Sequence, residues 1–170
     1  MSELKKSYFA SGCFWCITPT FQERKGVRSV ISGYSGGDEE NPVYLDVKQQ
    51  KTGHRETVMV EYNPEYVSYE ELFDIFLAGV DPFDGGGQFI DRGFSYTLAV
   101  YYTDEAQKQI AQSKIQQLEE ASGKQVHIAV EAFKSFWRAE EYHQDYHIKN
   151  PEAFRQELVE SGRIKTIKLN

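Results

Sequence analysis

The order in which strand-like and helix-like segments alternate is the feature that most limits what this chain can fold into. Apolar residues recur with strand or helix spacing, and capping residues mark several ends. The predicted strands cover residues 7–10, 27–34, 57–62, 96–102 and 126–132, and the predicted helices cover 17–24, 69–79 and 104–121. This β-α-β-β-α-β-α-β order predicts an α+β fold, a split βαβ or ferredoxin-like plait of two layers, with helices packed on one face of a mixed sheet.

Two long loops and an irregular C-terminal tail complete the predicted organisation. Residues 35–53 and 81–95 are rich in Gly, Asn, Asp and Pro, and loops this long inside a compact domain are usually functional. After the last predicted strand we expect a short helical turn near 139–146 and another with Pro151 in its first position. We expect the chain, 1–170, to form one domain, because no linker separates two compositions.

Charge and hydropathy exclude several classes of partner. The net charge is -7, and no basic face is visible, so nucleic acid is not expected as a partner. The longest apolar stretch, at 96–102, is far shorter than the roughly 20 residues that a membrane span requires. The first residues mix charges and lead into no apolar run, so we expect no signal peptide and a cytoplasmic protein.

The chain has only two cysteines, Cys13 and Cys16, which cannot form a structural disulfide framework for 170 residues. Cys13 is predicted at or just before a helix N-terminus, where unpaired N–H groups and the helix dipole favour a thiolate. Cys16 follows at i+3, close enough to resolve an oxidised Cys13 as a disulfide. The alternative is two small buried hydrophobic residues.

A zinc site is a second use of the two cysteines, because C-x-x-C supplies half of a tetrahedral site and His143 and His147 lie four residues apart. The gap between the halves is long, and we expect these histidines in hydrogen bonds or packing. His54 and His127 are expected at the surface. A zinc-stabilised binding module without catalysis therefore stays as an alternative, but no metal is predicted.

A series of short motifs occurs in order along the chain: Gly12-Cys13-Phe14-Trp15, Gly33-Tyr34-Ser35-Gly36-Gly37, Asn41-Pro42-Val43-Tyr44, Thr52-Gly53-His54-Arg55-Glu56, Ser68-Tyr69-Glu70-Glu71, Asp81-Pro82, Gln88-Phe89-Ile90-Asp91-Arg92-Gly93 with Tyr96, and Ala139-Glu140-Glu141-Tyr142-His143-Gln144. With these motifs the chain resembles the peptide-methionine (S)-S-oxide reductases, the A-type methionine sulfoxide reductases. The resemblance runs from about Tyr8 to His147. The main alternative is a thioredoxin-like dithiol-disulfide oxidoreductase, which also uses C-x-x-C, although the element order here differs from that fold.

The resemblance implies an oxidoreductase with one catalytic domain that reduces the S epimer of methionine sulfoxide, free or in proteins, to methionine. Cys13 would attack the sulfur and become a sulfenic acid. Cys16 would resolve it as a disulfide, and thioredoxin or another dithiol would recycle the protein. Phe14 and Trp15 would form the apolar wall that accepts the substrate methyl group. No cofactor is implied.

A sulfoxide sulfur is a poor electrophile until its oxygen is protonated, so the thiolate must be paired with an acid. By resemblance Glu56 is that acid, with a pKa raised by an apolar pocket. Tyr44 and Tyr96 would donate hydrogen bonds to the same oxygen, and Asp91 would order the site. Taken singly, each could instead be a surface carboxylate, a turn residue or a packing tyrosine.

The chain departs from the pattern of many relatives at several positions. Cys16 stands where glycine is common, and Lys48 stands where many relatives have a recycling cysteine, so Cys16 alone is left for the resolving role. Thr18, Val80 and Phe89 replace residues common in the family. These three changes concern substrate preference rather than the mechanism.

Overall fold

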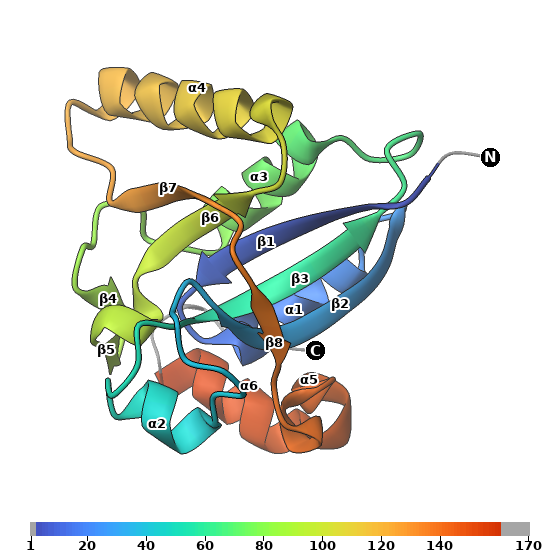
Figure 1. Cartoon of the computed structure of the whole chain (residues 1–170), viewed down its shortest axis with the longest axis vertical. Helices are drawn as coiled ribbons and strands as arrows, with labels where there is room; N and C mark the ends of the chain where they lie inside the picture. The colour runs from blue at the N-terminus through green and yellow to red at the C-terminus, as the bar shows by residue number, and fades with distance from the viewer. Residues whose placement is uncertain (1–2, 161–170) are drawn as a thin grey trace.

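The computed structural model describes residues 3–160, which are built around one six-stranded sheet (Figure 1). The strand order across it is β7-β6-β1-β3-β2-β8. The strands are β1 Lys5–Ser11, β2 Val27–Ser35, β3 Arg55–Tyr62, β6 Leu98–Tyr102, β7 Ile128–Ala132 and β8 Phe136–Arg138. Neighbouring strands are antiparallel except β6 and β7, which are parallel, so the sheet is mixed as predicted.

Helices and short elements fill the connections. The helices are α1 Phe14–Gln22, α2 Tyr44–Lys48, α3 Tyr69–Ala78, α4 Glu105–Ser122, α5 Tyr146–Lys149 and α6 Pro151–Glu160, with 3-10 turns η1 Phe94–Tyr96 and η2 Glu141–His143. A separate hairpin is formed by β4 Gly87–Gln88 and β5 Asp91–Arg92. None of the helices described within residues 3–160 has the length and apolar character that a membrane span needs.

The predicted plait is confirmed by the order of the central strands. Taken along the chain, β1-α1-β2-β3-α3-β6 gives the spatial order β6-β1-β3-β2, with all three pairs antiparallel. This is the arrangement of a split βαβ unit. The helix α4 then carries the chain to β7, which extends the sheet in parallel beside β6. The topology brings the end of β1 and the start of β3 to one edge of the sheet, where the motif residues gather.

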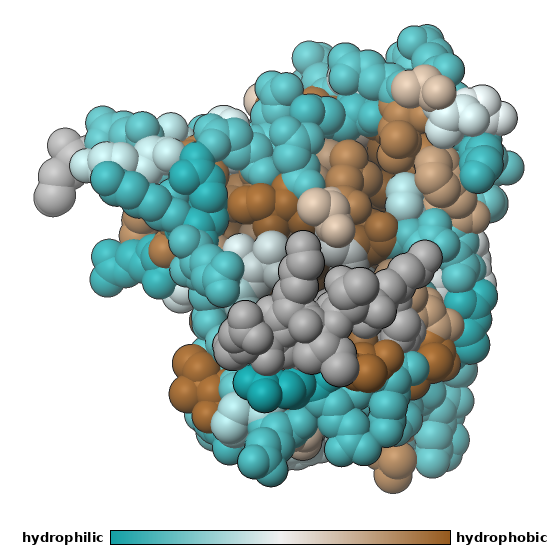
Figure 2. All heavy atoms as spheres, turned by 180° about the vertical axis from the view of Figure 1, so that it is seen from behind, coloured by the Kyte–Doolittle hydropathy of each residue, from teal (hydrophilic) through white to brown (hydrophobic). Residues whose placement is uncertain are grey.

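Apolar side chains cover both faces of the sheet. On one face Phe9 of β1 lies 5.2 Å from the ring of Phe21 of α1 and 5.3 Å from Phe76 of α3. On the other face Tyr8 stacks on Phe133, with 4.2 Å between the ring centroids. Burying each large side chain contributes roughly 1.5–3 kcal/mol to folding. Seen from behind (Figure 2), polar residues cover most of the surface and apolar side chains gather between them.

The first helix begins earlier than predicted, at Phe14 rather than residue 17, and Pro19 lies inside it. A proline inside a helix removes a hydrogen bond and costs about 3 kcal/mol. The helix nevertheless continues because Phe14, Ile17 and Phe21 are buried. Thr18 Oγ1 also donates a hydrogen bond of 2.7 Å to the Phe14 carbonyl. Tertiary packing therefore outweighs the local signal of the proline.

The other helix signals are confirmed, whereas the loops and the tail hold more structure than predicted. Ser68 and Glu71 form the predicted capping box of α3. Short elements inside the two predicted long loops are α2, β4, β5 and η1. The tail contributes β8, which pairs with β2, in addition to the helices expected there. A strand of three residues has no periodicity to detect, so sequence patterns miss it.

Candidate active site

Both cysteines lie at the start of α1. Gly12, with φ +85°, turns the chain out of β1, and Cys13 is the N-cap of the helix. The backbone N–H of Cys16 donates to the Cys13 carbonyl at 3.2 Å. Neither cysteine is in a disulfide, and both are buried, with 6% and 8% of their surface exposed. The predicted position of the cysteine pair at a helix N-terminus is confirmed.

The expectation of a Cys13 thiolate is wrong for this conformation. A hydrogen bond with Cys16, burial, and the nearby Glu56 and Asp91 carboxyl groups raise the pKa of Cys13 well above its ordinary value. The helix N-terminus favours an anion by only about 0.3–1 kcal/mol, and by up to about 2 kcal/mol in a partly buried site. Removal from water beside acidic groups outweighs that contribution. Cys13 is therefore a protonated thiol in this conformation.

Glu56 is a buried carboxyl group on β3, with 1% of its surface exposed. Its Oε1 accepts a hydrogen bond of 3.3 Å from the backbone N–H of Phe14, the residue next to Cys13. Burial raises the pKa of Glu56 to about 8, although the Phe14 N–H and Tyr96 oppose the rise. Its Oε2 has no hydrogen-bond partner among the described residues. The predicted raised pKa is confirmed, so this carboxyl holds a proton at neutral pH.

Tyr44, Tyr96 and Asp91 come from three different elements and lie around Glu56. Tyr44 begins α2, Tyr96 ends η1, and Asp91 begins β5. Burial, followed by the nearby Glu56 carboxyl, raises the pKa of both phenols, which therefore stay protonated. The charge of Asp91 acts on the pKa of Cys13, Glu56 and both tyrosines. The structure thus brings the predicted polar side chains together at one edge of the sheet.

The two predicted apolar residues lie within a cluster of rings. Phe14 is 1% exposed and lies 5.0 Å from the His143 ring and 6.5 Å from the Tyr44 ring, measured between centroids. Trp15 is half-buried and stacks on Tyr146 with 4.0 Å between centroids and an interplanar angle of 9°. Phe14 and Trp15 are therefore held among aromatic side chains from the C-terminal tail.

Sequence reasoning missed the side chains of the tail that hold this cluster. Glu140 accepts hydrogen bonds from the Tyr34 hydroxyl at 2.7 Å and from the Tyr44 backbone N–H at 2.9 Å. Gln144 is buried and binds both the N–H and the C=O of Ser32 on β2, at 3.0 and 2.9 Å. In the sequence, Glu140 and Gln144 stand out only as members of the motif at 139–144, and no role in the site was predicted for that motif.

The histidines take other places than a zinc site. The Trp15 indole N–H donates to His143 Nδ1 at 3.0 Å, and the His147 ring packs 5.7 Å from Phe154. Among residues 3–160, no group of three metal-binding side chains is arranged around a common point. The expected surface position of His54 is wrong, because it is fully buried and accepts from the Gly37 N–H at 3.2 Å.

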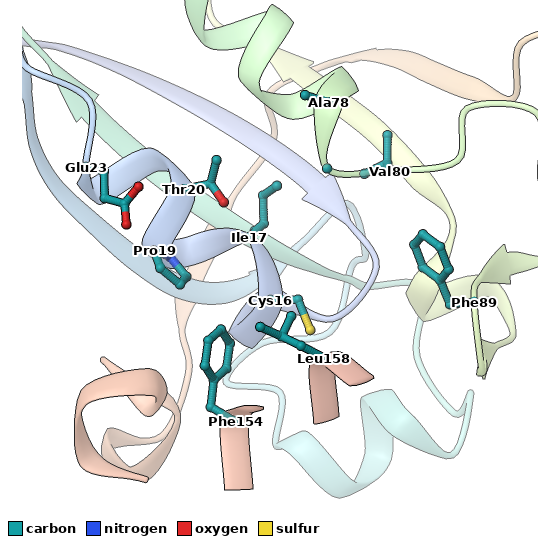
Figure 3. Close-up of a pocket in the computed structure, with 11 residues that line it drawn as sticks. Cys16, Ile17, Pro19, Thr20, Glu23, Ala78, Val80, Phe89, Phe154 and Leu158 are labelled. Atoms are coloured by element: carbon teal, nitrogen blue, oxygen red, sulfur yellow. The ribbon is translucent and has the colours of Figure 1, made fainter. Parts of the chain in front are cut away.

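The helix α6 covers the two thiols. Leu158 is buried in a small cluster with Cys13 and Cys16, and Phe154 packs against it. Beside them lies a pocket of about 370 Å³ lined by Cys16, Ile17, Pro19, Thr20, Glu23, Ala78, Gly79, Val80, Phe89, Phe154 and Leu158 (Figure 3). Val80 and Phe89, where the chain departs from the family pattern, thus line the same pocket as Cys16.

Comparisons with known proteins agree with the resemblance. The sequence profile of a family described as "Peptide methionine sulfoxide reductase" matches residues 5–169. The peptide methionine sulfoxide reductase MsrA of Bacillus velezensis is 45% identical over 166 residues, covering 96% of this chain and 94% of the relative. MsrA 2 of Staphylococcus aureus is 46% identical over 156 residues, covering 91% and 88%.

Two solved structures have a similar fold. Reduced Mxr1 from Saccharomyces cerevisiae superposes with a TM-score of 0.82 and 28% identity, covering 88% of this chain and 87% of that one. Methionine sulfoxide reductase A of Corynebacterium diphtheriae gives a TM-score of 0.79 and 29% identity, covering 87% and 76%.

We predict that Glu56 makes the free energy of unfolding depend on pH. Its pKa is about 8 in the folded state, against an ordinary value of 4.5. The stability contributed by the neutral carboxyl is fully present below about pH 4.5 and is lost as pH rises through about 8. Wild type should therefore lose up to about 5 kcal/mol relative to Glu56→Gln across this window.

Urea unfolding at pH 5 and pH 9 measures this difference. Glu61→Gln is the matched control, because Glu61 lies on the same strand but is half-buried rather than fully buried. Its difference from wild type should stay constant. A pH-independent difference for Glu56→Gln would show that Glu56 is ionised in the folded protein at neutral pH.

We predict that α6 limits access to the thiols. Leu158→Ala removes apolar area that docks α6 on the cysteines, so alkylation of the thiols by iodoacetamide should accelerate about tenfold. Val159→Ala is the control, since Val159 is 40% exposed on the same helix and should leave the rate unchanged. Equal rates in wild type and Leu158→Ala, measured by mass spectrometry, would contradict a covering role.

Proposed function

Since the chain belongs to the peptide methionine sulfoxide reductase family, we propose that its reaction is carried out by Cys13 as nucleophile and Glu56 as acid. The chain is an oxidoreductase that reduces methionine sulfoxide to methionine. One observation carries the assignment of roles: a protonated, buried carboxyl group lies one hydrogen bond from the start of the helix that Cys13 caps. An acid held neutral at pH 7 beside a thiol is the pair that sulfoxide reduction requires.

In the proposed chemistry, Cys13 Sγ attacks the sulfoxide sulfur while Glu56 gives its proton to the oxygen. Attack forms a bond between the two sulfurs while the S–O bond of the substrate breaks and releases the protonated oxygen as hydroxide. The hydroxide then bonds to Cys13 Sγ as the sulfur–sulfur bond breaks, so methionine leaves with its sulfur reduced by two electrons and Cys13, oxidised by two electrons, carries a sulfenic acid. The proton that Cys13 loses restores the carboxyl group of Glu56, so the step takes up no net proton. The Cys16 thiol then condenses with the sulfenic acid, and a disulfide and one water form.

The surrounding side chains support this step. Tyr44 and Tyr96 keep their protons, because burial raises the pKa of both phenols, and they can donate to the oxygen as negative charge develops there. Asp91 orders these groups by its charge. Phe14 and Trp15 would receive the methyl group. Since oxygen and methyl must point to different sides, only one epimer fits, and the resemblance assigns the S epimer.

An external dithiol must return the disulfide to two thiols, because the chain has no third cysteine. Mxr1, the yeast relative, has also been solved in complex with Trx2. We assign the same class of partner, a thioredoxin, to this chain. A cycle that begins from two reduced thiols fits a reducing compartment such as the cytoplasm. We further propose that 1–170 acts as one catalytic domain, since the tail completes a site built from the first strands.

We predict that Glu56→Gln lowers the rate of S-epimer reduction by at least about a hundredfold, because it removes the proton donor. Methionine formed from purified protein and excess dithiothreitol is the measurement. Tyr44→Phe should lose less, since Tyr96 remains, and Glu61→Gln should match wild type. The R epimer should not be reduced. A Glu56→Gln rate within a few-fold of wild type would remove Glu56 from the acid role.

We predict that Cys16→Ser separates the chemical step from recycling. Without reductant it should still release about one methionine per chain, while turnover with thioredoxin falls sharply. Cys13→Ser should release none. Mass spectrometry of wild type after one turnover should find a Cys13–Cys16 disulfide. Undiminished thioredoxin turnover in Cys16→Ser would mean that the reductant attacks the sulfenic acid directly.

A further inference from the structure

Two contacts hold the Trp15 indole: one fixes the plane of the ring and the other fixes its rotation within that plane. Its face stacks on Tyr146, at 4.0 Å and 9°, which sets the plane of the ring. Its Nε1–H donates to His143 Nδ1 at 3.0 Å, which fixes the ring's rotation within that plane. Stacking alone tolerates sliding and reversal of an indole, whereas a hydrogen bond to one atom does not.

His143 is suited to act as a fixed acceptor. It is 1% exposed, and its ring lies 4.0 Å from Tyr142, 4.3 Å from Tyr44 and 5.0 Å from Phe14. Burial lowers the pKa of His143 to about 4, so the ring is neutral at physiological pH. Because Nδ1 accepts from Trp15, the single ring proton lies on Nε2.

Residues before and after His143 in the sequence, Glu140 and Gln144, fix the backbone that carries it. The side chain of Gln144 binds the N–H and C=O of Ser32 and the carbonyl of Ala139. The carboxylate of Glu140 binds Tyr34 and the N–H of Tyr44. His143 therefore has a set position relative to both β2 and α2, and it transmits that position to Trp15 across 128 residues of chain.

We propose that His143 is a positioning residue that sets the orientation of the Trp15 indole and thereby the preference of the site for a methyl over a larger alkyl sulfoxide. This inference rests on the proposed role of Trp15 in receiving the substrate methyl group. An apolar wall discriminates one methylene by about 10- to 200-fold, and only if its surface is held in place. Without an acceptor, the half-buried indole N–H would turn toward another partner, because leaving it unsatisfied costs about 1–3 kcal/mol.

Two variants separate this role from simple packing. His143→Leu removes the acceptor, whereas His143→Asn places an amide oxygen close to where Nδ1 lies and keeps it. His127→Asn is the control, since the His127 side chain is exposed and lies beside Gly85, outside the cluster of rings around Trp15. The chain has only two tryptophans, so the indole N–H of Trp15 gives one of two signals in a ¹H–¹⁵N spectrum.

The expected results concern both the spectrum and the kinetics. In His143→Leu the Trp15 indole signal should move upfield, and the ratio of kcat/KM for methionine over ethionine S-sulfoxide should fall about tenfold. In His143→Asn both should stay near the wild-type values. An unchanged indole signal or an unchanged ratio in His143→Leu would overturn the proposal. Equal loss of the ratio in both His143 variants would do the same.

A further pair covers the case in which His143→Leu does not fold. Trp15→Phe removes the donor, so it should lower the methyl preference, and adding His143→Ala, which removes the acceptor, should change the ratio no further. An additional loss in the double variant would contradict action through Trp15. Failure of the proposed function is recognised separately, because wild type would then reduce neither sulfoxide while the indole signal would still report the hydrogen bond.

Discussion

The hydrogen bond from the Phe14 N–H to Glu56 is the contact on which the rest of the site depends. It joins the helix that carries both cysteines to the central strand β3. The acceptor is a carboxyl group with almost no contact with water, so the bond has little competition from solvent. The burial that holds this helix against β3 also raises the pKa of Glu56, so one packing arrangement sets both the position of the helix and the protonation of the carboxyl group.

The plait could be predicted because local signals carry it, whereas the polar residues of the site were predicted from the resemblance of the motifs to a known family. Alternating apolar residues mark β3, and Ser68 with Glu71 marks the start of α3. The motifs around Cys13 and Glu56 indicate the reaction. Local signals do not show which side chains will surround a residue after the chain has folded. The pKa of Cys13 depends on which side chains surround it after folding, and the start of α1 depends on the core that buries Phe14.

The C-terminal tail shows the same limit most clearly. The sequence predicts only a short helical turn near 139–146 in an irregular tail, because the side-chain hydrogen bonds that hold this segment go to β2, to α2 and to Trp15 rather than along the chain. Such segments have no period for a pattern to detect. Buried Gln144 and His143 are unusual as residue types for a core, and that is the physical signal that a tail of this kind is bound to a site.

The covering of the thiols by α6 has a kinetic consequence. Both cysteines are buried against Leu158, with Phe154 packed on the same cluster, so a bulky substrate would reach the sulfurs only if α6 moved away from them. The observed affinity for a protein substrate is then the intrinsic affinity multiplied by the population of the undocked form. A partner that binds α6 in its undocked position would raise that population. The same burial would slow the oxidation of both thiols by peroxide between turnovers, so the protein would stay active for longer.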